Sequence, residues 1–332
     1  MENPEKDNTD LQFNNRIPLD ELKTAVDNIK KQLSKIIIGQ DDFIEMLIVA
    51  LLANGHVLIE GVPGIAKTIT AKLFAKTLET DFSRIQFTPD LMPSDVLGTS
   101  VLNMKTSDFE FKKGPIFSNV ILIDEINRAP AKTQSALFEV MEERQITMDG
   151  ERHIMEYPFI VLATQNPIEQ EGTYALPEAQ LDRFLFKIKV DYPSLEQEII
   201  ILKTHHDRKQ VIPENTIEGV LTPEALRTFR AQVQEVLIED KIFTYIAQLV
   251  DKTRNHPHLF LGGSPRASLA IMNASKAHAA INGRDFVTPD DIKKTLVPVL
   301  RHRIILSPER EMEGMTPETV INLISHSIEI PR

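Results

Sequence analysis

Eight consecutive residues have the types and spacing of a phosphate-binding loop. They follow an apolar run at 56–60 and open a helical pattern: Gly61-Val62-Pro63-Gly64-Ile65-Ala66-Lys67-Thr68. A tight glycine-containing loop turns backbone N–H groups toward phosphates at a helix N-terminus, where a lysine adds charge and a threonine hydroxyl can ligate Mg²⁺. We predict that this loop and Ile69 bind ATP, with Lys67 on the phosphates and Thr68 on the metal. The alternative is an ordinary glycine-proline loop before a helix.

Two residues at the end of this loop depart from common patterns. Ala66 stands where the GxxxxGK[ST] pattern has its second glycine, and we expect a negative φ there, which would tolerate the methyl group. Lys67 lies in the first turn of the expected helix, where the macrodipole disfavours a cation. A broken local rule often marks a functional site, and here it indicates a site that binds an anion.

An acidic pair follows the most apolar of the expected strands. Residues 120–123 form a continuous apolar run, as in a strand covered on both faces, and Asp124 and Glu125 come directly after it. Ligands bind at the carboxyl ends of strands in open α/β sheets. Neighbouring side chains on a strand point to opposite sides, so we assign Asp124 to the Mg²⁺ shell, through water, and Glu125 to polarising the attacking water. Taken alone, the pair could be two solvated carboxylates.

The elements that must position these residues alternate in type along the chain. Short β-rich runs at 56–60, 84–87, 120–123, 159–164 and 184–190 are separated in several places by helical segments, which predicts an α/β fold with a parallel sheet between helices. Residues 99–111 and 145–155 alternate around turn-forming centres and are expected to be inserted hairpins.

The chain divides into a tail and two expected domains. Residues 1–16 form a polar, flexible N-terminal tail, and residues 17–192 form the α/β core with both hairpins. Residues 193–332 have a mainly helical pattern. Three of these helices are predicted to start at a capping residue followed by proline, at 222–223, 264–265 and 288–289. These helices predict a smaller all-α domain.

Composition restricts the remaining possibilities. The longest apolar run, residues 46–53, is too short to span a membrane, and the polar N-terminus lacks the pattern of a secretory signal, so a cytoplasmic location is expected. The chain has no cysteine, which excludes thiolate chemistry. The net charge of -11, without a basic block to offset it, disfavours a nucleic-acid partner.

Four segments resemble the AAA+ ATPases, and within them the MoxR family, which is related to the small ATPase subunit of magnesium chelatase. These segments are GVPGIAKT, LIDEINRAP, ATQNP and GTYALPEAQLDRF, and the resemblance runs from about Ile36 to Arg266. It implies a P-loop core followed by a helical lid, with ATP and Mg²⁺ as cofactors. In the family, the two hairpins resemble inserts that face the centre of a ring, although an exposed hairpin without function is as good a reading.

The resemblance also assigns roles to five further residues. Asn166 matches sensor 1, which positions the water, although a turn asparagine before proline is the alternative. Arg183 matches the arginine finger offered to a neighbouring subunit's nucleotide, whereas base rates favour a surface salt bridge with Asp182 or Glu178. Arg266 matches sensor 2 in the lid, and we expect it to share one anion with Lys67. Ile38 and Gly39 match the segment that lines the adenine.

Three function hypotheses remain open from the sequence. The leading one is a ring-forming homo-oligomer, a hexamer, that uses ATP hydrolysis to remodel or mature a protein client. The resemblance implies a partner with a von Willebrand factor A domain. The second is the ATPase subunit of a chelatase-like metal-insertion complex, and the third is a module that assembles on ATP without turnover. A nucleic-acid motor is the least favoured.

Overall fold

A five-stranded sheet forms the core of the protein. The computed structural model describes residues 16–62, 64–105, 107–166, 174–209 and 211–331. The sheet has the strand order β2-β5-β8-β1-β9, and every neighbouring pair is parallel, as the alternation predicts. The strands are β1 (His56–Gly61), β2 (Phe82–Gln86), β5 (Val120–Asp124), β8 (Ile160–Gln165) and β9 (Phe184–Val190).

Both faces of this sheet are covered by apolar side chains. Along β5, Val120 and Leu122 pack into one buried cluster, whereas Ile121 and Ile123 pack into the other, because successive strand residues point to opposite faces. The first cluster includes side chains of α1 (Asp20–Ser34), α2 (Asp41–Leu52) and α3 (Lys67–Thr77), and the second includes α5 (Ala131–Glu143). Residues 120–123 of β5 are therefore uniformly apolar because helices lie on both sides of this strand.

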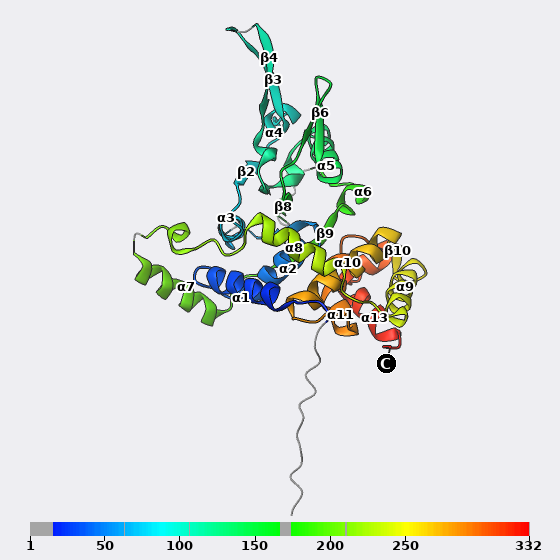
Figure 1. Ribbon diagram of the computed structural model, residues 1–332. Coiled ribbons are helices and arrows are strands. Elements are labelled where there is room, and N and C mark those ends of the chain that lie inside the picture. The colour runs from blue at the N-terminus through cyan, green and yellow to red at the C-terminus, as the bar shows by residue number, and fades with distance from the viewer. Residues whose placement is uncertain (1–15, 63, 106, 167–173, 210, 332) are drawn as a thin grey trace, which may run out of the picture.

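Two antiparallel hairpins project from the same end of the core (Figure 1). They lie where the alternating segments predict them, as β3 (Gly98–Asn103) with β4 (Asp108–Lys113) and β6 (Gln145–Met148) with β7 (Glu151–Ile154). The short helix α4 (Pro93–Leu97) leads into the first hairpin. The rings of Phe111 and His153 stack with centroids 4.4 Å apart, and Ser100 Oγ donates to the Asp149 carboxylate. These contacts join the two hairpins to each other.

The chain after β9 is mainly helical. Its helices are α7 (Leu195–Arg208), α8 (Pro223–Gln234), α9 (Asp240–Arg254), α10 (Pro265–Ile281), α11 (Pro289–Leu300), α12 (Pro308–Met312) and α13 (Pro317–Ser327), with α6 (Glu178–Leu181) before β9 and a small pair of strands, β10 (Leu259–Leu261) and β11 (Ile305–Leu306). The helices α8, α10 and α11 begin at the predicted prolines. Because α2 packs against α8 and α10, one apolar cluster continues from the sheet into these helices.

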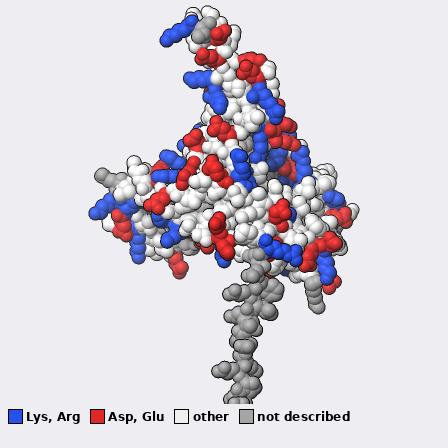
Figure 2. Space-filling view, viewed as in Figure 1, with Lys and Arg blue, Asp and Glu red and all other residues white. Residues whose placement is uncertain are grey.

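The described helices include no membrane span, and the face of the molecule in Figure 2 shows no single basic patch. Within the described ranges, no helix is both long enough and apolar enough to cross a membrane. Figure 2 shows acidic and basic side chains interspersed over the face in view. The hairpin tips, by contrast, expose large apolar side chains, among them Met104 and Phe109, which are 84% and 73% exposed.

Candidate nucleotide site

The predicted phosphate loop joins the end of β1 to the first residue of α3. A Cβ atom on Gly61 would lie 2.5 Å from the Ile65 side chain and 2.8 Å from the Val190 carbonyl oxygen, so only glycine fits there. Gly64 has φ of +88°, which also favours glycine. The loop therefore takes its shape from these two glycines, and Pro63 lies outside the described residues.

The conformation of Ala66 corrects the prediction from sequence. Its φ is +63°, in the left-handed region, and not the negative value expected. The backbone must turn sharply here because α3 begins at the next residue. A residue with a Cβ costs about 1 kcal/mol in this conformation, so the alanine is a strained position beside the phosphate-binding lysine.

The side chain of Lys67 folds back over the loop. Its Nζ donates to the carbonyl oxygen of Gly61 at 2.6 Å. Burial lowers the pKa of Lys67, while the charges of Asp124 and Glu125 act in the opposite direction. The ammonium group is thus held at the loop by a carbonyl group, which an incoming phosphate oxygen can replace.

Asp124 is buried at the carboxyl end of β5, where the sequence predicts it. Its Oδ2 accepts from Arg84 Nε at 2.6 Å, and its Oδ1 accepts from Thr164 Oγ1 at 3.2 Å. Arg84 comes from β2 and Thr164 from β8, the two strands that flank β5. The carboxylate is therefore fixed from both sides.

Glu125 turns out of the strand direction. Its φ of +57° is left-handed, and its N–H donates to Thr164 Oγ1 at 3.0 Å. The carboxylate accepts from Gln86 Nε2 at 2.9 Å and pairs with Arg128 Nε at 2.9 Å. The two carboxylates thus have different partners, while Thr164 Oγ1 contacts both residues.

These residues surround a cavity of about 410 Å³. Its lining joins the loop, both carboxylates and the residue after β8: Gly64, Ala66, Lys67, Thr68, Ile69, Arg84, Gln86, Asp124, Glu125, Thr164 and Asn166. Loop N–H groups at a helix start and a lysine suit phosphates, and hydroxyl and carboxylate oxygens are ligands that Mg²⁺ prefers. The residues present therefore fit a nucleotide with Mg²⁺.

Replacing Lys67 with alanine is expected to weaken ATP binding at least about tenfold, because a hydrogen bond to a charged group contributes about 1.5–3 kcal/mol. Isothermal titration with ATP and Mg²⁺ measures this loss. Lys76→Ala serves as the control, since Lys76 lies on the same helix but does not line the cavity. Unchanged affinity in Lys67→Ala would place the phosphates elsewhere.

Arg84, Gln86 and Thr164 belong to the site but were not predicted from the sequence. Arg84 and Gln86 alternate along β2, so a period of two puts them on one face of that strand. This alternation is visible in the sequence and indicates that the two side chains lie on the same face of the strand. It does not show that β2 is the neighbour of β5, which is what brings both side chains to the acidic pair.

The segment predicted to line the adenine does not line this cavity. It lies against the phosphate loop, since Gln40 Nε2 donates to the Ile65 carbonyl oxygen at 2.9 Å. Gly39 has φ of +74°, and a Cβ there would collide with the Gln197 side chain at the start of α7. Gly39 thus lies beside the start of α7, and contact of Ile38 and Gly39 with adenine stays a prediction.

Arg183 and Arg266 lie together outside the cavity. Arg183 Nη1 pairs with the Glu142 carboxylate at the end of α5 and donates to the Phe138 carbonyl oxygen at 3.2 Å. Arg266 Nη2 pairs with the same carboxylate at 3.0 Å. In this conformation of a single chain, Arg266 shares Glu142 with Arg183 and does not line the cavity, so an anion shared by Arg266 and Lys67 stays a prediction.

Contacts of Asp182 explain this placement. Its Oδ2 accepts from Ser264 Oγ at 3.0 Å, which fixes the start of α10 beside the end of α6. Its Oδ1 accepts from the buried guanidinium of Arg303 at 2.6 Å. Because Asp182 binds these two partners, the start of α10 points Arg266 toward α5, next to Arg183.

The sheet, the loop and the acidic pair define the class of protein. A family model described as "ATPase family associated with various cellular activities (AAA)" matches residues 56–186, and a model of the AAA lid domain matches residues 251–324. The chain is an AAA ATPase with a helical lid.

Comparison with individual proteins narrows this class. The chain is 46% identical to the uncharacterized protein YeaC of Bacillus subtilis, over 91% of this chain and 93% of YeaC. It is 43% identical to the chaperone MoxR1 of Mycobacterium tuberculosis, over 91% of this chain and 81% of MoxR1. A crystal structure of a candidate ATPase from Cytophaga hutchinsonii has a TM-score of 0.87 at 40% identity and covers 94% of this chain and 97% of its own. The chain belongs to the MoxR family of AAA+ ATPases.

Proposed function

We propose that this ATPase works as a ring of identical subunits, a hexamer, in which each nucleotide is held between two neighbours. The observation that carries the proposal is the separation of the predicted catalytic groups. Lys67, Glu125 and Asn166 line the cavity, whereas Arg183 and Arg266 lie together on Glu142. A head-to-tail contact joins two different surfaces of one chain and closes into a ring when the rotation fits. It would bring one subunit's arginines to the next subunit's nucleotide.

Within one subunit, the proposed reaction uses the groups of the cavity. Thr68 and Asp124 hold Mg²⁺, directly or through water, and Mg²⁺ when bound neutralises charge that develops on the phosphates. Glu125 orients the attacking water and accepts its proton, and Asn166 positions that water. Gln86 and Arg128 both contact Oε2 of Glu125 and hold its carboxylate in the present conformation.

In this proposal, Glu142 binds the two arginines until a neighbouring subunit's phosphate replaces it. One carboxylate here pairs with two guanidinium groups, which leaves the cluster with a net positive charge. A γ-phosphate from the neighbouring subunit offers more negative charge and more acceptor oxygens than Glu142. Arg183 and Arg266 would therefore transfer from the carboxylate to the phosphate on assembly.

We further propose that hydrolysis remodels a protein client in the cytoplasm, together with a partner that carries a von Willebrand factor A domain. The family supplies the partner class, and the hairpin of β3 and β4 supplies a client-facing surface. This hairpin extends away from the core (Figure 1) and exposes apolar side chains, including Met104 and Phe109. Exposed apolar side chains grouped on a projecting element are typical of a contact with another protein.

Replacing Met104 and Phe109 with serine is expected to abolish client binding and to leave basal ATP hydrolysis unchanged, because the hairpin lies outside the cavity. The measurement compares proteins retained by ATP-bound assemblies that carry Glu125→Gln, with and without the two substitutions, by quantitative mass spectrometry. Ile154→Ser is the control, since Ile154 is an exposed apolar residue of the other hairpin. Retention of the same proteins in equal amounts by the serine variant would exclude this hairpin as the client site.

The domain division at residues 192–193 remains part of the proposal. It is supported by the two matched ranges, 56–186 and 251–324, which fall on opposite sides of it.

The alternative of a chelatase-like role predicts a different result from that of client remodelling. In that case, adding partner subunits would produce metal insertion without client remodelling.

A further inference from the structure

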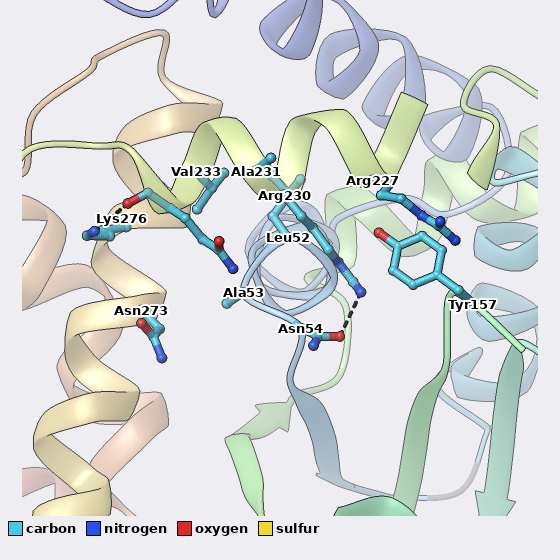
Figure 3. Close-up of a pocket in the computed structure, with 11 residues that line it drawn as sticks. Leu52, Ala53, Asn54, Tyr157, Arg227, Arg230, Ala231, Val233, Asn273 and Lys276 are labelled. Atoms are coloured by element: carbon cyan, nitrogen blue, oxygen red, sulfur yellow. Dashed lines mark hydrogen bonds between the residues drawn. The ribbon is translucent and has the colours of Figure 1, made fainter. Parts of the chain in front are cut away.

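A second cavity, of about 640 Å³, lies at the opposite end of the sheet from the nucleotide site. Figure 3 shows the residues that line it. Asn54 precedes β1 and Tyr157 precedes β8, so the cavity adjoins the amino ends of these strands, whereas the nucleotide cavity adjoins their carboxyl ends. The remaining walls come from α2, α8 and α10. Its volume lies in the range of small-molecule sites.

The charged residues that line this cavity are all basic. Arg227 and Arg230 are three residues apart on α8 and so share a face of that helix. Lys276, on α10, lines the other side of the cavity, where its Nζ donates to the Gln234 carbonyl oxygen at 2.7 Å (Figure 3). Arg144 adds a fourth cation, since it donates to the side-chain oxygen of Asn54. Among the described residues, none of these four cations forms an ion pair with a carboxylate. In a chain of net charge -11, such a cluster requires an explanation.

Arg230 is the most deeply placed of these cations. The residue is 8% exposed, and its Nε donates to the Leu51 carbonyl oxygen at 2.8 Å and its Nη1 to Asn54 Oδ1 at 2.6 Å. Its Nη2 is buried without a hydrogen-bond partner in the described part of the chain. Two of its nitrogens thus anchor the end of α2, and the third is left for a group outside the protein. Burial lowers the pKa of Arg230 to about 10, so it stays charged at neutral pH.

Tyr157 presents a second unused donor beside it. The guanidinium carbons of Arg227 and Arg230 lie 4.7 Å and 4.9 Å from the centre of the tyrosine ring, which holds all three side chains together. Within the described residues, the Tyr157 hydroxyl is buried and its hydrogen has no acceptor, while the Arg230 guanidinium acts on its oxygen as a weak donor. Burial raises the pKa of this hydroxyl, so it keeps its proton and can donate it to an acceptor.

We propose that this cavity binds the phosphate group of a small phosphorylated molecule, with Arg227, Arg230 and Tyr157 as donors to the phosphate. A guanidinium presents parallel N–H donors that match phosphate oxygens, and buried unpaired donors lose their cost when an anion accepts from them. The cavity is larger than a phosphate ion, so an organic portion fits beyond it, between Lys276 and the side-chain amides of Asn54 and Asn273. This proposal does not depend on the proposed client or on ring assembly.

The test is isothermal titration of the full-length chain with inorganic phosphate and with pyrophosphate. The protein carries Lys67→Ala, so that the nucleotide site does not contribute to the signal. Arg227→Gln is expected to weaken phosphate binding by about tenfold or more, because it removes a charged donor. Arg227 is exposed and makes no backbone contact that the fold requires, so its removal should leave the folded state intact. Lys252→Gln, at an exposed lysine of α9, is the matched control and should bind phosphate as before.

Three results would overturn the proposal. They are the absence of phosphate binding in the Lys67→Ala protein, equal affinities in the Arg227→Gln and Lys252→Gln variants, and binding of acetate as tight as that of phosphate. Arg230→Lys adds a second check that keeps the charge but removes the planar pair of donors. We expect it to weaken phosphate binding while circular dichroism shows the wild-type helix content.

Discussion

Glu125→Gln is expected to bind ATP with wild-type affinity and to hydrolyse it at least about 100-fold more slowly, the size of effect typical of a lost general base. The amide keeps the shape of the side chain and its contact with Gln86, but it cannot accept a proton from water. Phosphate release measures the rate, and titration with ATP measures the affinity. Because nucleotide stays bound, the variant should also accumulate as the assembled ring, which light scattering detects.

Glu143→Gln is the control for this substitution, since Glu143 is an exposed glutamate at the end of α5. It should hydrolyse ATP at the wild-type rate. A Glu125→Gln protein that retains wild-type turnover would show that another group activates the water. A protein without measurable hydrolysis in any variant, including the wild type, would instead agree with a module that assembles on ATP without turnover.

Arg183→Ala is expected to lower the hydrolysis rate about 1,000-fold or more, as removal of an arginine finger does, and to leave ATP affinity nearly unchanged. The reason is that Arg183 lies outside the cavity of its own chain and would act on the neighbour's transition state. The fold should tolerate the change because Arg266 still neutralises Glu142. Arg310→Ala removes an arginine from an exposed ion pair with Glu313 and should have no effect on the rate.

The parallel sheet could be predicted from the sequence because each of its strands is a short, recognisable β-rich run. Residues 120–123 are all apolar only because helices cover both faces of β5, and the hairpins alternate because they stand away from the core. Lys67, Thr68, Asp124 and Glu125 line one cavity because their positions follow from the ends of β1 and β5.

The features that the sequence did not reveal depend on which elements become neighbours in space. Arg84 and Thr164 reach Asp124 only because β2 and β8 flank β5. The order of the strands in the sheet differs from their order along the chain, so the sequence does not give it. Arg266 lies beside Arg183 because Asp182 binds Ser264, and these two residues are 82 positions apart in the sequence. The left-handed turn at Ala66 follows from the path between β1 and α3, whereas a motif gives only residue types.

Mixing two inactive variants tests the shared site most directly. Arg183→Ala subunits keep the groups of the cavity, and Glu125→Gln subunits keep the arginine. When the two are co-assembled in equal amounts, random order should restore about a quarter of the sites, since each head-to-tail interface draws its two halves independently. We predict that ATP hydrolysis by the mixture rises well above the sum of the separate proteins. A mixture no more active than that sum would contradict an ATPase site completed by a second copy of the chain.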